Sequence, residues 1–225
     1  MNALRLDLVA DAVNPRRRYH APQRAERAVA TRRAVLAAAS ELFTTRGYPA
    51  TTVAQIAARA GVNVDTLYAA VGRKPALLRE VVETAISGQD RGVPAEERDY
   101  VRAVRAAPTA GEKIDLYADA LARMSPRTAP VFRALREAAA QDPDCAALHA
   151  EITGRRAANM RRFAADLRAT GELRAVRGDD EVADIVWSMN STEYYSLLVE
   201  DRGWTPQRFG AHLADAWRRL LLRTS

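Results

Sequence analysis

The sequence predicts an all-α protein with a small N-terminal domain and a larger C-terminal helical domain. From Thr31 onward, apolar side chains recur at the spacings of three and four that place them on one face of a helix. Aromatic residues make up only 6% of the chain and alanine is frequent, which favours packed helices over sheets. Strand-like alternation of apolar and polar residues does not stand out, nor does an internal repeat.

The first 30 residues are predicted to form a flexible basic arm, because helical periodicity is lacking past Ala12 and arginines cluster in "NPRRRYHAPQRAER". Residues 1–75 hold 12 Lys and Arg against 5 Asp and Glu, whereas residues 76–225 hold 22 against 23. The net charge of +6 therefore comes from the first third of the chain. This split indicates a negatively charged partner, nucleic acid or acidic lipid, although a basic tail without a partner would give the same pattern.

Residues 31–77 are predicted to hold three short helices. The first begins at Thr31 as N-cap and ends near Gly47, which suits the left-handed residue after a helix. The second, in "TTVAQIAARAG", is capped by Thr51 or Thr52 and closed by Gly61.

The third helix follows at once, with Asn63 as N-cap and Gly72 at its end, and Pro75 suits the first turn of a further helix. Two short helices that are joined by a tight glycine turn and packed on another helix predict a helix-turn-helix.

Residues 78–225 are predicted to form the larger helical domain. Its clearest segment is "TPQRFGAHLADAWRRLLL", in which Thr205 serves as N-cap and Pro206 as the first helical residue. Helix breaks are expected at residues 92–94, 108–111, 125–126, 142–143, 171, 178 and 203, where Gly, Pro, Ser and Asp occur.

The composition argues against several kinds of chemistry. Cys145 is the single cysteine, so an intrachain disulfide is excluded and a zinc site is not expected. The histidines His20, His149 and His212 are isolated, and no nucleophile elbow, phosphate loop or dinucleotide fingerprint occurs. We therefore expect no enzyme activity, no metal and no cofactor. Apolar runs fall well short of a membrane span, and the first residues do not resemble a signal peptide, so a cytoplasmic protein is expected.

The stretch from Thr31 to Leu78 resembles the DNA-binding domain of tetracycline-repressor-type (TetR) bacterial regulators. The shared elements include "RGY" at 46–48, the paired threonines at 51–52, "AGV" at 60–62, "TLY" at 66–68, and Gly72 with Lys74. The last helices, "LLVEDRGWTPQRFGAHLADAWRRLLL", resemble the dimerising helices of some members. The resemblance implies a homodimer that inserts the third helix of each subunit into the major groove of an inverted-repeat operator. It also implies repression that is relieved when a small-molecule effector binds the larger domain.

Affinity for DNA comes mainly from phosphate contacts, whereas sequence preference comes from base edges. Val64 and Ala69 suit contact with thymine methyl groups, and Asp65 suits a cytosine amino group; exposed apolar residues without a partner are the alternative for the first two. The resemblance places Thr51, Thr52, Tyr68 and Lys74 on phosphates, although both threonines would also serve as caps alone. The predicted DNA-contacting residues are Arg16, Arg17, Arg18, Thr51, Thr52, Asn63, Val64, Asp65, Thr66, Tyr68, Ala69, Arg73 and Lys74.

The larger domain is long enough to enclose a ligand pocket between its helices. Its polar or bulky residues at helical spacing are the candidates, with plain core as the alternative: Tyr117, Met124, Phe132, His149, Met160, Phe163, Trp187, Asn190 and Tyr194. Asn190 is the most informative, because an amide among apolar neighbours needs a hydrogen-bond partner. The predicted dimer interface comprises Leu197, Phe209, Leu213, Ala216, Trp217 and Leu220.

A ligand-responsive DNA-binding regulator, most simply a repressor, is the function that these observations and the resemblance favour together. A basic-armed nucleic-acid or interaction protein without ligand control is the alternative. Membrane docking is disfavoured, because no basic helix with a large apolar face lies near the arm.

Overall fold

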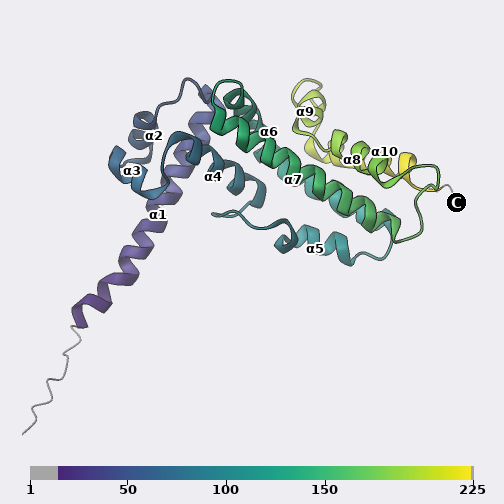
Figure 1. The fold of residues 1–225 in the computed structure, drawn as a ribbon, viewed down its shortest axis with the longest axis horizontal. Helices are drawn as coiled ribbons and strands as arrows, with labels where there is room; N and C mark the ends of the chain where they lie inside the picture. Colours follow the sequence, from purple (N-terminus) through teal and green to yellow (C-terminus); the bar gives the residue numbers. More distant parts are fainter. Residues whose placement is uncertain (1–14, 224–225) are drawn as a thin grey trace, which may run out of the picture.

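The computed structural model describes residues 15–223, and their side chains from residue 23 onward. These residues form ten α-helices and no extended strand, so the predicted all-α class is confirmed for them (Figure 1). The N-terminal helices are α1 (Pro15–Arg46), α2 (Val53–Ala60), α3 (Val64–Ala70) and α4 (Lys74–Ser87). The C-terminal helices are α5 (Asp99–Ala106), α6 (Ala110–Ala139), α7 (Pro143–Arg168), α8 (Asp179–Met189), α9 (Thr192–Tyr195) and α10 (Pro206–Leu221).

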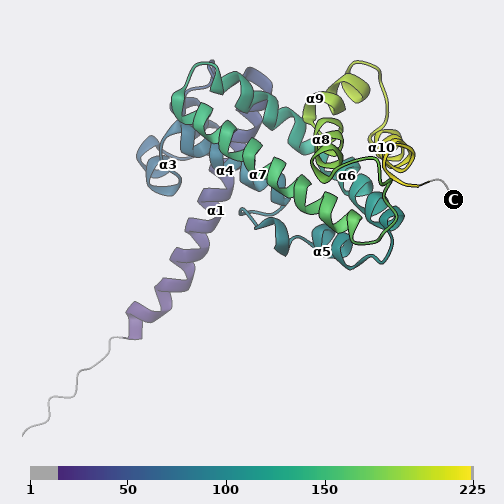
Figure 2. The same cartoon turned by 45° about the vertical axis from the view of Figure 1, so that its right-hand side comes forward.

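The chain becomes helical earlier than expected, because α1 begins at Pro15 and runs through Thr31 without a break. Proline suits a first helical turn, and the alanines and arginines that follow are strong helix formers. Residues 23–30 are all exposed, and this part of α1 projects away from the other helices (Figures 1 and 2). The expectation that helical structure begins only at Thr31 is therefore wrong, and so is Thr31 as N-cap. The arm's first 14 residues lie outside the described part of the chain.

The N-terminal core joins the two expected domains rather than separating them. Its buried residues come from α1 to α4 and also from the facing ends of α6 and α7, including Leu135 and Leu148. Leu77 and Leu78, which flank the expected boundary, are both fully buried in this core and lie inside α4. Thus α4 belongs to the helix-turn-helix domain and to the larger domain at once.

The C-terminal core fills the space between α5, α6, α7, α8 and α10. Helix α6 continues through Pro126 and Pro130, so the break expected at residues 125–126 is wrong. A proline inside a helix costs about 3 kcal/mol. Neighbouring Ser125, Thr128 and Ala129 are buried on both sides of these prolines, so tertiary packing offsets that cost.

The long helices α6 and α7 follow one another through a short turn and pack side by side along the body of the molecule (Figure 2). Helices α2 and α3 lie at one end, and α8 and α10 at the other (Figures 1 and 2). The exposed helix-turn-helix and the last helix are therefore well separated in space.

Candidate DNA interface and candidate ligand cavity

The helix-turn-helix is built from local signals that the sequence predicts. Thr52 caps α2 in a reciprocal capping box with Gln55, and Gly61 ends the helix in the left-handed conformation at φ +69°. The Val62 amide donates to the Ala57 carbonyl at 3.0 Å, which closes the turn. Asn63 then caps α3 by accepting from the Thr66 amide at 2.7 Å. These bonds satisfy the free amides and carbonyls of both short helices.

The outer face of α3 carries few charges. Asp65 and Ala69 are exposed and Tyr68 is 47% exposed, whereas Leu67 points inward and is fully buried. Val64 is half-buried and packs against the N-terminal core, so only part of its side chain lies on the surface. The exposed face can therefore offer Asp65, Tyr68 and Ala69 to a partner without unfolding the helix.

The two neighbouring threonines point in opposite directions. Thr51 is fully buried, and its hydroxyl donates to the Gly47 carbonyl at 2.8 Å, with the Leu42 carbonyl at 3.2 Å. The prediction that Thr51 contacts phosphate is therefore wrong, because its hydroxyl is enclosed and used inside the chain. Thr52 is exposed and faces outward as the cap of α2.

Lys74 lies at the start of α4, half-buried against Tyr48. Its ammonium donates to the Tyr48 carbonyl at 2.6 Å and lies 3.9 Å from the centre of the Tyr48 ring. Burial lowers the pKa of Lys74, although two acidic neighbours in this cluster act in the opposite direction. Lys74 therefore fixes the start of α4 on the loop before α2. Arg73, its neighbour and the N-cap of α4, is exposed.

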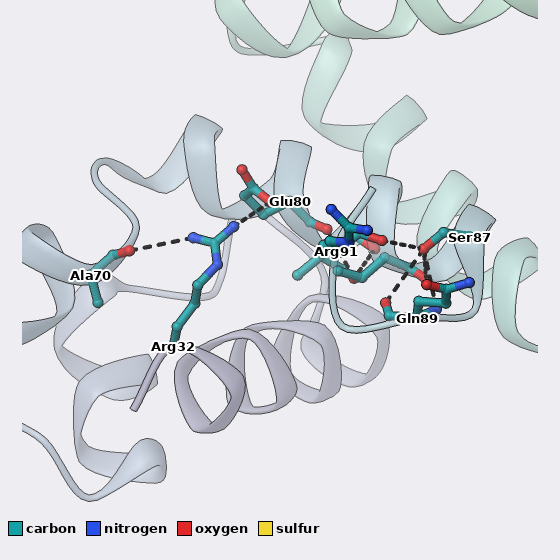
Figure 3. Close-up of polar contacts among 8 residues, drawn as sticks. Arg32, Ala70, Glu80, Ser87, Gln89 and Arg91 are labelled. Atoms are coloured by element: carbon teal, nitrogen blue, oxygen red, sulfur yellow. Dashed lines mark hydrogen bonds and ion pairs between the residues drawn. The ribbon is translucent and has the colours of Figure 1, made fainter. Parts of the chain in front are cut away.

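Arg32 connects three helices, as Figure 3 shows. Its guanidinium donates from Nη1 to the Ala70 carbonyl at 3.3 Å and from Nη2 to the Glu80 carboxylate at 2.6 Å. Ala70 ends α3, where unpaired carbonyls attract a cation, and Glu80 lies on α4. The position of α3 is therefore tied to that of α4 through a side chain of α1.

A cavity of about 650 Å³ lies between α4, α5, α6 and α7 and the loop after α4. That loop leaves α4 through a turn in which the Ser87 hydroxyl donates to the Arg91 carbonyl at 2.6 Å (Figure 3). Six of the nine predicted ligand residues line the cavity: Tyr117, Met124, Phe132, Met160, Phe163 and Asn190. This volume is typical of pockets that enclose a drug-sized molecule.

The other three predicted ligand residues lie elsewhere, so their assignment to the cavity is wrong. His149 lies on α7, half-buried and away from the cavity wall. The Tyr194 hydroxyl and His212 Nε2 are 2.7 Å apart, which joins α9 to α10. Trp187 stacks on Arg156, a residue that does line the cavity, with the guanidinium carbon 4.4 Å from the ring centre.

Polar groups gather at the inner wall of the cavity. The Asn190 amide nitrogen donates to the Tyr117 hydroxyl at 2.7 Å, and it also lies 2.9 Å from the Met160 sulfur. The Asn190 carbonyl oxygen is buried and has no donor among the described residues. Burial raises the pKa of Tyr117, which therefore stays a neutral phenol. The predicted need of Asn190 for a partner is met by its nitrogen only.

The cavity wall reaches α4 directly. Glu83 and Ile86 of α4 both line it, and Glu83 pairs with Arg155 of α7 at 2.5 Å. A second pair joins the same two helices, because Arg79 meets Glu151 at 2.8 Å. A molecule in the cavity would therefore contact the helix whose other residues belong to the helix-turn-helix core.

Solved structures of similar architecture are found across nearly the whole chain. SmeT in complex with triclosan matches with a TM-score of 0.67 and 17% identity, over 87% of this chain and 93% of SmeT. NalD, the secondary repressor of the MexAB-OprM multidrug efflux pump in Pseudomonas aeruginosa, matches with a TM-score of 0.66 and 20% identity. The match covers 87% of this chain and 98% of NalD. A Saccharomonospora viridis protein described as a transcriptional regulator, in complex with choline, matches with a TM-score of 0.65 and 18% identity. The match covers 86% of this chain and 98% of that protein. These likenesses show a common fold.

The family model for bacterial regulatory proteins of the tetR family matches residues 35–81. These residues run from the buried part of α1 through the helix-turn-helix into α4. This stretch of the chain therefore belongs to the tetR family of bacterial regulatory proteins. A comparison with curated protein sequences finds no match. The matched stretch holds the helix-turn-helix, and the larger helical domain is shared with the solved structures as a fold.

The apolar stripe of α10 is mostly internal. Phe209, Leu213 and Trp217 are at most 1% exposed, and Trp217 stacks on Tyr117 of α6 with ring centres 5.7 Å apart. Their assignment to a dimer interface is wrong, because helical periodicity shows that a face is buried but not which partner buries it. Ala216 is half-buried, and Leu220 is 39% exposed. Leu197, just before α10, is 56% exposed.

Three functional candidates are not predicted by the sequence: Arg32, Arg156 and the Glu83–Arg155 pair. Their partners lie 31 to 72 residues away along the chain, so no local pattern indicates them. Within residues 23–223, no group of His, Cys, Asp and Glu side chains is placed to hold a metal ion. No helix of the described chain has the length and apolar character needed to cross a bilayer.

Proposed function

We propose that this chain is a TetR-type transcriptional regulator, a sequence-specific repressor that leaves its operator when a small molecule occupies the cavity. One observation carries the proposal: α4 takes part in both sites. Leu77 and Leu78 are buried in the core beneath the helix-turn-helix, and Glu83 and Ile86, about two turns further on, line the cavity. A rigid helix that contacts both sites can convert a change in the cavity into a shift of α3.

Base reading falls on the exposed face of α3. Asp65 can accept a hydrogen bond from a cytosine amino group, and Ala69 can contact a thymine methyl group. Val64 contributes at most its exposed edge, since the rest packs inward. The absence of Arg and Lys from α3 suits a helix that selects sequence without adding general affinity.

Phosphate anchoring falls on the surroundings of α3. Thr52 and Arg73 are exposed at the starts of α2 and α4, the Tyr68 hydroxyl lies on an exposed side chain, and Lys74 lies beside them. Asn63 and Thr66 form the N-terminal cap of α3, and they are further candidates for contact with the DNA backbone. Amides at helix starts favour an anion, so the predicted phosphate contacts are chemically reasonable there.

The N-terminal extension of α1 supplies further positive charge. Arg16, Arg17 and Arg18 lie in its first turns, although their side chains fall outside the described part of the structure. Since the extension is helical and projects from the body, it would reach DNA as a rod beside the site that α3 contacts (Figure 1). We assign it to phosphates flanking the half-site.

A homodimer would present two copies of α3 to an inverted repeat. Of the predicted interface residues, Leu197 and Leu220 are exposed and Ala216 is half-buried, so they remain available for such a contact. An interface that includes α10 would lie at the end of the molecule away from α3 and would leave both copies of the helix-turn-helix free to reach the same side of a duplex (Figure 2).

Selection from a random duplex library at two salt concentrations, read by sequencing, tests this function. The expected result is an enriched inverted repeat whose half-sites lie about one helical turn, roughly 34 Å, or a multiple of it apart. Binding that weakens with salt but enriches no sequence would contradict it, because phosphate contacts alone would then account for the affinity.

A further inference from the structure

We propose that the cavity binds an apolar carboxylic acid whose carboxylate pairs with Arg156. This inference rests on the proposed function in one respect only, that the cavity is an effector site. Three observations support it: Arg156 has no carboxylate partner among the described residues, the cavity wall has an excess of positive charge, and the remaining lining is largely apolar.

Arg156 is a largely buried cation without a carboxylate partner. Its Nη2 donates to the Trp187 carbonyl at 2.8 Å, the Trp187 ring covers one face, and Nε is buried with no acceptor among the described residues. Glu193, an acidic neighbour, pairs with Arg136 instead. Burial lowers the pKa of Arg156, which reflects the cost of holding this charge away from water. A bound anion would offset that cost.

The cavity wall has an excess of positive charge. It includes the five arginines Arg98, Arg105, Arg155, Arg156 and Arg162, against the three carboxylates Glu83, Glu96 and Asp166. Glu83 pairs with Arg155, and Arg105, Arg162 and Glu96 are exposed. The half-buried charges that remain on the wall are Arg98, Arg156 and Asp166, a net of +1. A cationic ligand would therefore meet repulsion at the inner wall, whereas an anionic ligand would meet an unpaired guanidinium.

A second donor lies near Arg156. The Tyr117 hydroxyl points its hydrogen at the Met160 sulfur, 3.6 Å away, and a thioether is a weak acceptor. A carboxylate oxygen would accept this hydrogen more strongly. Asn190 holds the phenol oxygen in place from the other side at 2.7 Å. Arg156 and Tyr117 thus form a pair of donors at one region of the wall.

The remainder of the cavity suits an apolar body. Tyr117 stacks on Tyr100 with ring centres 6.3 Å apart and lies 5.0 Å from the Phe163 ring. Phe132 and Met124 add further apolar surface. A ligand with a carboxylate on a ring system or on an alkyl chain of medium length would pack its apolar part against these side chains. Its carboxylate would pair with Arg156.

Isothermal titration of the full chain without DNA tests this proposal with two acids, 2-naphthoate and decanoate, each beside its neutral amide. At least one acid is expected to bind about tenfold or more tightly than its amide, because a charge-assisted hydrogen bond is lost with the charge. Arg156→Met is expected to remove this preference, and Arg156→Lys to retain part of it. Arg162→Gln, on the same wall but exposed, is expected to keep it in full.

Three results would overturn the proposal: amides that bind as well as the acids, an acid preference that survives in Arg156→Met, or no binding of either acid at millimolar concentration. The melting temperature of each variant separates a ligand role from a structural one. An uncompensated buried cation contributes little net stability, so Arg156→Met is expected to melt within a few degrees of the wild type. Because no DNA is present, a failure of operator release would leave the binding result unaffected.

Discussion

At the scale of single residues, the side chains on the exposed face of α3 and those that position α3 have different roles. Asp65 is an acid on the face that we propose for DNA, where its charge would disfavour any placement in which it meets phosphate rather than a base. Arg32 lies behind the same helix and contacts no exposed face of α3, yet it sets where the helix stands. In the proposed complex, Asp65 would contribute to the choice of base, and Arg32 would fix the position of α3.

Replacing Asp65 by Ala should relax the preference for one base pair in each half-site by about 1–3 kcal/mol, the discrimination that one base contact supplies. Affinity for random duplex should rise slightly, since repulsion from phosphate is removed. Fluorescence anisotropy on single-base variants of the selected operator measures both effects. Asp184→Ala, an exposed acid on α8, is the matched control. An unchanged base preference in Asp65→Ala would remove this residue as a reader.

Replacing Arg32 by Met should weaken operator binding roughly tenfold, because the link from α3 to Glu80 is lost. Unfolding should cost only about 1 kcal/mol less than in the wild type, since the ion pair is partly exposed. Arg33→Met breaks a more exposed pair, with Asp90, and should leave operator affinity unchanged. Equal losses in the two variants would show that general charge matters and the position of Arg32 does not.

At the scale of elements, the helix-turn-helix depends on residues that relieve backbone strain. Gly61 has φ +69°, and no atom lies within 4 Å of where its Cβ would be, so only the conformation opposes a side chain. Gly154 has the same open surroundings but lies within α7. Gly61→Ala should therefore lower the free energy of unfolding by about 1 kcal/mol, and Gly154→Ala should raise it by about 0.5–1 kcal/mol. Denaturant unfolding that shifts both in the same direction would contradict this account.

The same elements show why some features can be predicted from sequence. The cap at Thr52, the left-handed Gly61 and the cap at Asn63 depend on neighbouring residues, so local pattern suffices. Thr51 and Thr52 lie in the segment that leads into α2, and Thr52 has extended backbone, in which neighbouring side chains point to opposite sides; one position therefore decides between a buried hydroxyl and an exposed one. The Arg- and Ala-rich segment of α1 was misassigned because it has helix propensity without an apolar stripe.

Features that depend on distant partners were beyond the reach of the sequence. Met124 and Phe132 line the cavity while His149 and Trp187 do not, although all four lie on long helices of the same domain. The periodicity of a sequence shows which face of a helix is apolar. It does not show whether that face packs in the core, lines a cavity or contacts another subunit, because this depends on three-dimensional packing.

At the scale of the whole molecule, α4 contributes to both the helix-turn-helix core and the cavity wall, and α10 lies at the opposite end from α3 (Figure 2). Leu197→Glu together with Leu220→Glu should produce a monomer of about 24.7 kDa in light scattering, because two charges would face each other across the interface. Val29→Glu, at an exposed apolar site on α1, should leave the dimer intact. A dimer that survives the double change would place the interface elsewhere.

The proposed function requires that the cavity and α3 are coupled, and operator affinity measured with and without a cavity ligand decides whether they are. The selected duplex would be titrated with protein in the absence of the tighter of the two acids and at its saturation. Coupling through α4 should weaken binding by about 5- to 150-fold, and saturating duplex should weaken acid binding by the same factor. An acid that binds tightly while operator affinity stays the same would contradict the account, because the cavity and the helix-turn-helix would then be independent.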